Sequence, residues 1–409
     1  MGWLANADDG RRFYLRYQAF EQGGADPYNI RREAAVYAAL QNTDVPIPQF
    51  VGSHPQYPAL LTEFVPGSGN YRRLRDPRQK TAIAEGAMAG LAALHRIDVA
   101  ALPLSSLGSF ATVAEAVRAE IAIWHGMYLE TGRRDALVEF VHAWLVENVP
   151  DISDPPSLVH GDAGPGNFMY DDGAFTKLID WELSHLGDPL EDIAWFSMRS
   201  AMEPVPDFPD LLRAYEAFSG RQIDHDRVLF YRVLVSWRVV IIRHRNSSGE
   251  LGGSIVSRAL NRRLVVEALA ACEGIVLIHP APLESKSERW TPLYDGVLEA
   301  LRDSVVGRSD EAIVIAKGKE IAKAVKYLRN IYRLEDALHR RETEAISSLL
   351  GERFTSHDQA HAGLLEAIER HSVGTAALIG YFATEAFYET ELARDAMGSL
   401  ASRHFPPLA

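Results

Sequence analysis

The sequence predicts an α+β fold in which a small N-terminal lobe containing strands precedes a helical lobe and an all-α C-terminal domain. Short apolar and β-branched runs, which are typical of strands, cluster in the first 65 residues and in one hairpin near the middle of the chain. Apolar residues recur at helical spacing through most of the remainder. A polar, proline-bearing linker at residues 280–287 separates two helical regions. We therefore expect three domains, at residues 1–66, 67–279 and 280–409.

The N-terminal lobe is expected to contain three strands and one helix. The strands are predicted at residues 13–17, 45–51 and 59–65, with turn residues between the last two. A helix is predicted to begin at Asp26-Pro27 and to run to Leu40, because proline is favourable in the first turn and alanines follow at helical spacing. Residues 1–10 are expected to form a short polar segment before the first strand.

The most informative stretch of the chain runs from Leu158 to Phe196. A brief apolar run places a His-Gly-Asp triplet, residues 160–162, at the end of a predicted strand. Two glycines and a proline follow and predict a tight loop, which Asn167 ends. Two short apolar runs, at residues 168–170 and 175–179, enclose the sequence Asp-Asp-Gly-Ala. This pattern predicts a β-hairpin.

The hairpin brings two oxygen-bearing side chains together. If the turn centres between Gly173 and Ala174, Asn167 faces Asp180, and facing residues in an antiparallel pair have Cβ atoms roughly 5 Å apart. A turn centred one residue earlier would move the register by two residues, and the pair would remain neighbours. An amide oxygen and a carboxylate at one end of a sheet suit Mg²⁺, a hard cation. Asp162 lies at the other end of the loop and is free to act as a base. One carboxylate as base, with an Asn/Asp pair on the metal, is the layout used for phosphoryl transfer to a hydroxyl.

The order HGDxxxxN followed by IDWE resembles the aminoglycoside phosphotransferase and choline kinase family, whose members are relatives of the protein kinases. The resemblance implies a bilobal kinase-like fold that uses ATP and Mg²⁺. Asp162 would be the catalytic base, and Asn167 and Asp180 would be the ligands of Mg²⁺. Glu182 could assist the metal or pair locally. Structural support for the catalytic loop would come from His160, Asp188 and Asp192.

The same resemblance assigns residues to the nucleotide. A basic residue on a strand of the small lobe holds the phosphates and pairs with a glutamate on the next helix, and Arg16 and Glu33 occupy these places. The alternative is a surface arginine and a surface glutamate. Glu63 to Val65 would supply backbone groups to the adenine, or would form an edge strand and turn. Only fifteen residues precede Arg16, so we expect a reduced lobe without the phosphate-covering hairpin.

Helices are predicted through the second and third domains. In the second domain they are at residues 78–96, 113–129, 135–147, 209–220, 226–245 and 254–272. In the third they are at residues 293–306, 311–338, 341–350, 357–370 and 375–397. No metal-ligand or nucleophile spacing is evident in the third domain, which resembles a small all-helical domain found beside bacterial phosphotransferases. This resemblance implies an interaction role, with a homo-oligomer as the expected form.

Composition excludes other classes of protein. A formal net charge of −13 argues against nucleic-acid binding, which requires a basic surface. The single cysteine, Cys272, excludes an internal disulfide and a cysteine-based zinc site. The most apolar run, residues 228–242, contains two arginines and is too short to span a membrane, and the N-terminus shows no signal pattern. A cytoplasmic protein without membrane partners is expected.

The sequence therefore predicts an ATP-dependent phosphotransferase that acts on a hydroxyl of a small molecule. The motif and a VPxP segment also resemble the kinase-like domains attached to some acyl-CoA dehydrogenases, which indicates a hydroxyacyl or acyl-CoA acceptor. The alternative is a nucleotide-binding pseudokinase or scaffold without turnover, because the small lobe is short. The presence of Asp162, Asn167 and Asp180 together argues against this alternative.

Overall fold

The computed structural model describes residues 2–18, 26–246, 252–284 and 288–409, so residues 285–287 of the predicted linker lie outside the described residues. The chain forms two compact units. The first contains the chain up to Glu130, Asn148–Val235 and Phe405–Ala409, and the second contains Thr131–Glu147 and Ser236–His404. The three-domain division predicted from the sequence stays a prediction.

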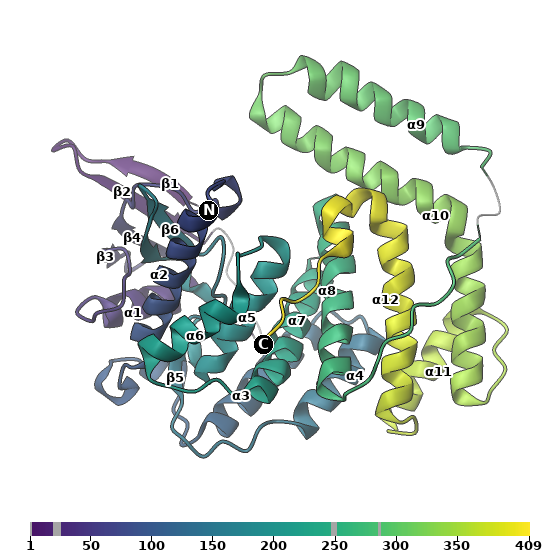
Figure 1. Ribbon diagram of the computed structural model, residues 1–409, viewed down its shortest axis with the longest axis horizontal. Coiled ribbons are helices and arrows are strands. Elements are labelled where there is room, and N and C mark those ends of the chain that lie inside the picture. Colours follow the sequence, from purple (N-terminus) through teal and green to yellow (C-terminus); the bar gives the residue numbers. More distant parts are fainter. Residues whose placement is uncertain (1, 19–25, 247–251, 285–287) are drawn as a thin grey trace. The chain divides into compact units, whose positions relative to one another are not determined.

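A four-stranded antiparallel sheet with the order β1-β2-β4-β3 opens the first unit (Figure 1). Its strands are β1 (Gly2–Asn6), β2 (Arg12–Tyr17), β3 (Phe50–Ser53) and β4 (Ala59–Glu63). The prediction of a short polar segment at residues 1–10 is wrong for Gly2–Asn6, which form β1 and make an antiparallel hairpin with β2, the strand that carries Arg16. The strand predicted at residues 45–51 begins only at Phe50, since Pro46 and Pro48 lack the N–H groups that a ladder requires.

Helix α1 (Ile30–Leu40) lies against β3 and β4. It begins later than the predicted start at Asp26-Pro27 because Asn29 caps it. The side-chain oxygen of Asn29 accepts hydrogen bonds from the backbone N–H groups of Arg31 and Arg32, both at 3.1 Å. This start places Glu33 in the first turn with its side chain buried.

The rest of the first unit consists of helices and two short antiparallel strand pairs. The helices are α2 (Pro77–His95), α3 (Val113–Leu129), α5 (Pro189–Met202) and α6 (Phe208–Ser219). The strands are β5 (Ser157–Val159), paired with β8 (His185–Gly187), and β6 (Phe168–Asp171), paired with β7 (Ala174–Leu178). Helix α2 packs against α6 and β7, which attaches the β6–β7 hairpin to the helical part of the unit.

The β6–β7 hairpin turns at Asp172-Gly173, so the predicted turn one residue later is wrong and the alternative turn is the one found. These two residues have φ values of 45° and 76°, as a type I′ turn requires. A bulge at Thr176 in β7 then shifts the pairing by one residue. Asn167 consequently lies beside Ile179, whose N–H donates to the Asn167 carbonyl at 3.0 Å, and not directly opposite Asp180.

The described part of the second unit is helical. Its helices are α4 (Ala136–Glu147), α8 (Gly252–Cys272), α9 (Thr291–Ala300), α10 (Ala312–Leu350), α11 (His357–Glu369) and α12 (Thr375–Met397). Helix α7 (His225–Arg245) begins in the first unit and continues into the second after Val235. Helix α12 packs against α8 and α10, and α10 also packs against α11.

Helix α10 joins two predicted helices, 311–338 and 341–350, into one helix of 39 residues. The predicted break is wrong because no glycine or proline interrupts residues 319–350. The helix ends where Gly351 adopts a φ of 67°. Within the described ranges of the chain, no helix combines the length and the apolar composition needed to cross a bilayer.

Candidate active site

The first unit contains a cavity of about 540 Å³ lined by residues of its sheet, helix α1 and the β6–β7 hairpin. Six predicted site residues line this cavity: Arg16, Glu33, Glu63, Val65, Asn167 and Asp180. The sequence separates these residues by up to 164 positions, and the fold brings them to one space. The other four predicted residues, Asp162, His160, Asp188 and Asp192, lie in the segments that support this hairpin.

Arg16, on strand β2, is the centre of a cluster of carboxylates. Its Nη1 donates to Glu33 Oε1 at 3.0 Å and also to Asp180 Oδ1, and its Nη2 donates to Glu182 Oε2. The Glu33 side chain is only 2% exposed, so the alternative of a surface glutamate does not describe it. The structure thus brings the predicted strand arginine, helix glutamate and metal-binding aspartate together.

The cluster carries more negative than positive charge. Burial raises the pKa of Glu33 to about 8, an effect that Arg16 only partly offsets and that Asp180 and Glu182 reinforce. Burial and the neighbouring Asp180 also raise the pKa of Glu182. Burial disfavours the charged guanidinium of Arg16, but the surrounding carboxylates outweigh it and raise the pKa of Arg16. A cation placed beside Asp180 and Glu182 would relieve this excess charge.

Asn167 and Asp180, which both carry side-chain oxygen atoms, line the same cavity. Asn167 uses its Nδ2 group for two hydrogen bonds, to the carbonyl of Asp162 at 2.8 Å and to Asp162 Oδ2 at 2.7 Å. This leaves the amide oxygen of Asn167 as its potential metal ligand. Asp180 has a φ of 69°, a left-handed conformation that is costly for a residue with a Cβ and that concentrates at functional sites.

Asp162 is held by an arginine that the sequence analysis does not identify. Arg199 donates from Nε to Asp162 Oδ1 at 2.7 Å and from Nη2 to Oδ2, and its Nη1 donates to the Pro165 carbonyl at 3.1 Å. Arg199 lies on α5, which the sequence analysis also does not predict. The sequence contained a signal for this helix, because Asp188-Pro189 is a typical helix start. Arg199 then lies two turns after Asp192, on the same face of the helix.

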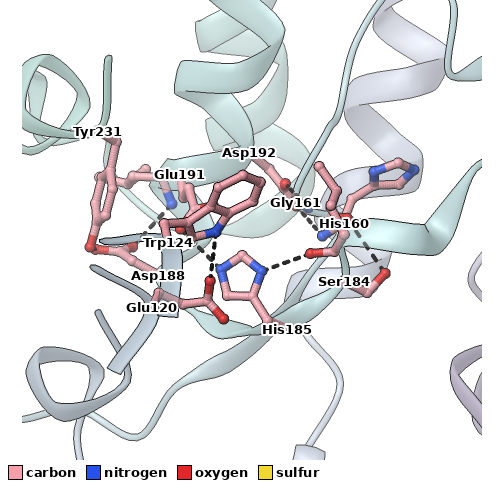
Figure 2. A network of polar contacts seen from close by, with 12 residues as sticks. Glu120, Trp124, His160, Gly161, Ser184, His185, Asp188, Glu191, Asp192 and Tyr231 are labelled. Carbon is pink, nitrogen blue, oxygen red and sulfur yellow. Dashed lines mark hydrogen bonds and ion pairs between the residues drawn. The ribbon is translucent and has the colours of Figure 1, made fainter. Parts of the chain in front are cut away.

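The loop that carries Asp162 is anchored on Asp192, which is fully buried (Figure 2). Asp192 Oδ2 accepts from the backbone N–H of His160 at 2.7 Å, and Oδ1 accepts from that of Gly161 at 2.9 Å. His95 Nε2 lies 2.9 Å from Asp192 Oδ2. Gly161 has a φ of 77°, and a Cβ there would lie 2.2 Å from the Leu183 carbonyl oxygen, so this position of the loop requires glycine.

Asp188 and His160 extend this anchoring to α5 and β7. Asp188 caps α5 by accepting from the Leu190 N–H at 3.0 Å, and its Oδ2 accepts from the Tyr231 hydroxyl at 2.9 Å and from Arg227 (Figure 2). His160 Nε2 donates to the Ile179 carbonyl at 2.9 Å, which ties the loop to the residue before Asp180. These bonds fix the positions of Asp162 and Asp180 through buried groups.

Comparison with known proteins identifies a family. The sequence model of the phosphotransferase enzyme family matches residues 3–231. The human protein named acyl-CoA dehydrogenase family member 11 is 28% identical over 182 residues, which cover 42% of this chain and 23% of that protein. The Arabidopsis thaliana protein named probable acyl-CoA dehydrogenase IBR3 is 29% identical over 340 residues, which cover 70% of this chain and 40% of that protein. The chain therefore spans less than half the length of these relatives.

Solved structures of phosphotransferases match this chain at low sequence identity. A structure described as a putative aminoglycoside phosphotransferase from Ralstonia eutropha is 20% identical with a TM-score of 0.48, and the match covers 80% of this chain and 90% of that one. A thermostable mutant of aminoglycoside phosphotransferase APH(4)-Ia is 18% identical with a TM-score of 0.49, and the match covers 67% and 95% of the two chains.

Proposed function

The chain belongs to the phosphotransferase enzyme family, and we propose that it transfers the γ-phosphate of ATP to a hydroxyl group of a small molecule. One observation carries this proposal. Asn167 lines the same cavity as Asp180 and donates from its amide nitrogen to Asp162, so the proposed base is a direct neighbour of one proposed metal ligand. This combination is the one that phosphoryl transfer to a hydroxyl requires.

The cavity suits a nucleotide. Leu60 and Ile179 contribute apolar surface, and Arg16 contributes a guanidinium that can bind phosphate oxygens in pairs. Val65, which also lines the cavity, makes no backbone hydrogen bond to any other described residue. Its N–H and C=O groups are therefore available for the edge of an adenine ring.

The residues present also suit Mg²⁺, which prefers carboxylate and amide oxygens. Asn167 and Asp180 would hold the ion, and the excess negative charge around Arg16 supports a cation at this point. When bound, Mg²⁺ neutralises and orients the phosphate groups. Glu182 lies on the same side, because Arg16 contacts both Glu182 and Asp180.

Asp162 accepts the proton in this proposal. The hydroxyl oxygen of the acceptor bonds to the γ-phosphorus, the bond to the β-phosphate oxygen breaks, ADP leaves, and the hydroxyl proton passes to the Asp162 carboxylate. Arg199 contacts both carboxylate oxygens and so fixes their direction. Oδ2 also accepts from Asn167, whereas Oδ1 accepts, among the described residues, from Arg199 alone and keeps a lone pair for the acceptor. Arg199 is therefore a positioning residue.

The acceptor that we propose is a hydroxylated acyl compound or acyl-CoA. Support comes from the human and plant relatives, whose names identify them as acyl-CoA dehydrogenases. A domain that phosphorylates a hydroxyacyl compound would act on the same chemical class as an acyl-CoA dehydrogenase. The pseudokinase alternative has one observation in its favour, since the turn between β1 and β2 holds Asp8, Asp9 and only one glycine.

The test measures ADP production with a panel of hydroxyacyl-CoAs, simple alcohols and aminoglycosides. We expect turnover with one class of acceptor and a reduction of kcat by about 10²- to 10⁴-fold in Asp162→Asn, because only the proton acceptor is lost. ATP binding should persist in this variant. Asp171→Asn is the matched control, since Asp171 is an exposed aspartate of the same hairpin, and its kcat should equal that of the wild type.

Three outcomes would each contradict a different part of the proposal. ATP binding without turnover on any acceptor would favour the pseudokinase. Turnover on aminoglycosides alone would retain the phosphotransferase but overturn the acyl acceptor. A kcat that is equal in Asp162→Asn and the wild type would overturn the role of Asp162.

A further inference from the structure

Helices α10 and α11 of the second unit bring a carboxylate and two imidazoles together. Glu342 comes from α10, and His357 and His361 lie one turn apart on α11. One potential ligand atom from each residue lies within 4.8 Å of the other two. The His-x₃-His pair does not by itself predict a metal site from the sequence, because the third possible ligand, Glu342, comes from a different helix.

The contacts within this cluster are only partly explained by hydrogen bonding. His357 Nε2 lies 2.5 Å from Glu342 Oε2, which is a hydrogen bond. His361 Nε2 lies 3.8 Å from the same oxygen, which is too far for one. His361 Nε2 is buried, and among the described residues it has no hydrogen-bond partner. A buried nitrogen without a hydrogen-bond partner costs free energy of folding. A metal ion bound to this nitrogen would remove that cost.

A single metal ion fits these separations. In a tetrahedral zinc site the bonds to nitrogen and oxygen are about 2.0–2.2 Å long, which sets neighbouring ligand atoms roughly 3.4 Å apart. The observed separations of 2.5 and 3.8 Å lie on either side of this value. Small side-chain rotations would therefore place both imidazoles and the carboxylate around one ion.

The surroundings of the cluster resemble those of an open metal site. Glu342, His357 and His361 line a cavity of about 480 Å³ within the second unit. His339, one turn before Glu342 on α10, stacks on the His357 ring with 4.2 Å between ring centroids and limits its movement. Three protein ligands beside a cavity leave a fourth position for water or a ligand, as in zinc sites that are not purely structural.

We propose that Glu342, His357 and His361 bind a divalent transition-metal ion of the Zn²⁺ class. Two imidazoles and a carboxylate favour such an ion over Mg²⁺ or Ca²⁺, which prefer oxygen ligands alone. The site would join α10 to α11 and would present the open position of the ion to the cavity. It is separate in the sequence and in its ligands from the Mg²⁺ site that we propose for the first unit.

The test uses the untagged full-length chain, stripped with a chelator and titrated with Zn²⁺ by calorimetry. An excess of Mg²⁺ occupies the acidic cluster around Asp180 during the titration. We expect one Zn²⁺ per chain with micromolar or tighter affinity. Loss of one ligand in His361→Gln or Glu342→Gln should weaken binding by at least about 100-fold, since even partners of ligands contribute 10- to 100-fold.

The matched control is His371→Asn. His371 is an exposed histidine just after α11 with a φ of 50°, a conformation that asparagine tolerates well, so this variant should bind Zn²⁺ like the wild type. Far-UV circular dichroism shows whether each variant is folded. In the wild type, Co²⁺ should give the strong visible absorption of a tetrahedral site. A failure to bind Zn²⁺, equal affinity in all variants, or an octahedral Co²⁺ spectrum would each overturn the proposal.

Discussion

Each of the two units has an arginine that contacts three carboxylates; it is half-buried in the first unit and buried in the second. In the first unit Arg16 contacts Glu33, Asp180 and Glu182. In the second unit Arg262 contacts Asp135 at 2.7 Å, Glu385 at 2.8 Å and Glu389 at 3.1 Å. The two clusters have the same composition of charged groups, yet their surroundings differ in ways that predict different roles.

Two of the three carboxylates of the Arg16 cluster are more open, whereas Glu33 is buried. The side chains of Asp180 and Glu182 are 34% and 48% exposed, whereas those of the Arg262 cluster are only 14–21% exposed. The carboxylates around Arg262 also have further partners. Asp135 Oδ1 accepts from the Leu137 N–H at 3.0 Å at the start of α4, and Glu389 Oε1 lies 2.6 Å from Arg258 Nε.

These differences separate a binding cluster from a structural one. The Arg262 cluster also lines a cavity, but Arg258 adds a second cation to it, and its contacts connect the start of α4 with α8 and α12. The Arg16 cluster leaves negative charge facing a cavity, so it needs a cation that the chain does not supply. The comparison therefore predicts that loss of Arg262 reduces stability, whereas loss of Arg16 reduces activity.

The largest effect is expected from Arg262→Met, which keeps the length of the side chain but leaves buried carboxylates without their partner. The free energy of unfolding should fall by about 3–5 kcal/mol, the usual cost of breaking a buried ion pair from one side. Urea denaturation followed by circular dichroism measures this change. The kcat of the protein that remains folded should be unchanged.

Arg370→Met is the control for this variant. Arg370 is 71% exposed and pairs with Glu366 one turn earlier on α11, so its loss should change the free energy of unfolding by less than about 0.5 kcal/mol. If Arg262→Met were as stable as this control, the Arg262 cluster would not be structural and the comparison would fail.

Arg16→Met should have a smaller effect, and on a different quantity. We expect kcat/KM for ATP to fall by about 100-fold, because a cationic donor to the phosphates is removed. The free energy of unfolding should change little, since two of the three carboxylates are partly exposed and Glu33, with its raised pKa, can take up a proton. Steady-state kinetics and urea denaturation measure the two quantities.

Arg16→Lys sharpens this prediction, because lysine keeps the charge but loses the planar fork of donors. Its kcat/KM should lie between those of the wild type and Arg16→Met. A loss of stability in Arg16→Met that matches the loss in Arg262→Met, with kcat/KM unchanged, would show that the Arg16 cluster is structural too.

The sequence predicted the family and the kinase-like fold class correctly, for a physical reason. The motif residues Asp162, Asn167 and Asp180 lie on one short loop and hairpin, so the pattern that indicates the family is visible in a single stretch of the sequence. Helix positions were also largely predictable, because apolar spacing and capping residues are local. The helix predicted at residues 375–397 has the bounds that the structure gives to α12.

What the sequence did not predict depends on contacts between distant elements or on small geometric details. The position of Arg199 opposite Asp162 follows from how α5 packs, and the Glu342–His357–His361 cluster follows from how α10 meets α11. The register of the β6–β7 hairpin depends on one bulge, which leaves no mark in the pattern of apolar residues. The roles assigned to the individual site residues stay predictions.

Stability is also expected to depend on pH, by a small amount for each step of pH. Burial raises the pKa of Glu33 to about 8 and that of Glu385 to about 7, although the contacting arginine partly offsets the shift in each case. A carboxyl group whose pKa is raised on folding binds its proton more tightly in the folded state. Its contribution to stability is therefore complete below its ordinary pKa of 4.5 and is lost as the pH rises to the folded value.

Glu33→Gln and Glu385→Gln cannot lose a proton, so each should remove one part of this slope. The loss between pH 4.5 and 8 should be absent in Glu33→Gln, and the loss between pH 4.5 and 7 should be absent in Glu385→Gln. The slope that each variant removes is at most about 1.4 kcal/mol per pH unit. Urea denaturation at half-unit steps of pH measures it. A wild-type slope in Glu33→Gln would mean that Glu33 stays ionised beside Arg16, and the Arg16 cluster would then carry still more negative charge toward the cavity.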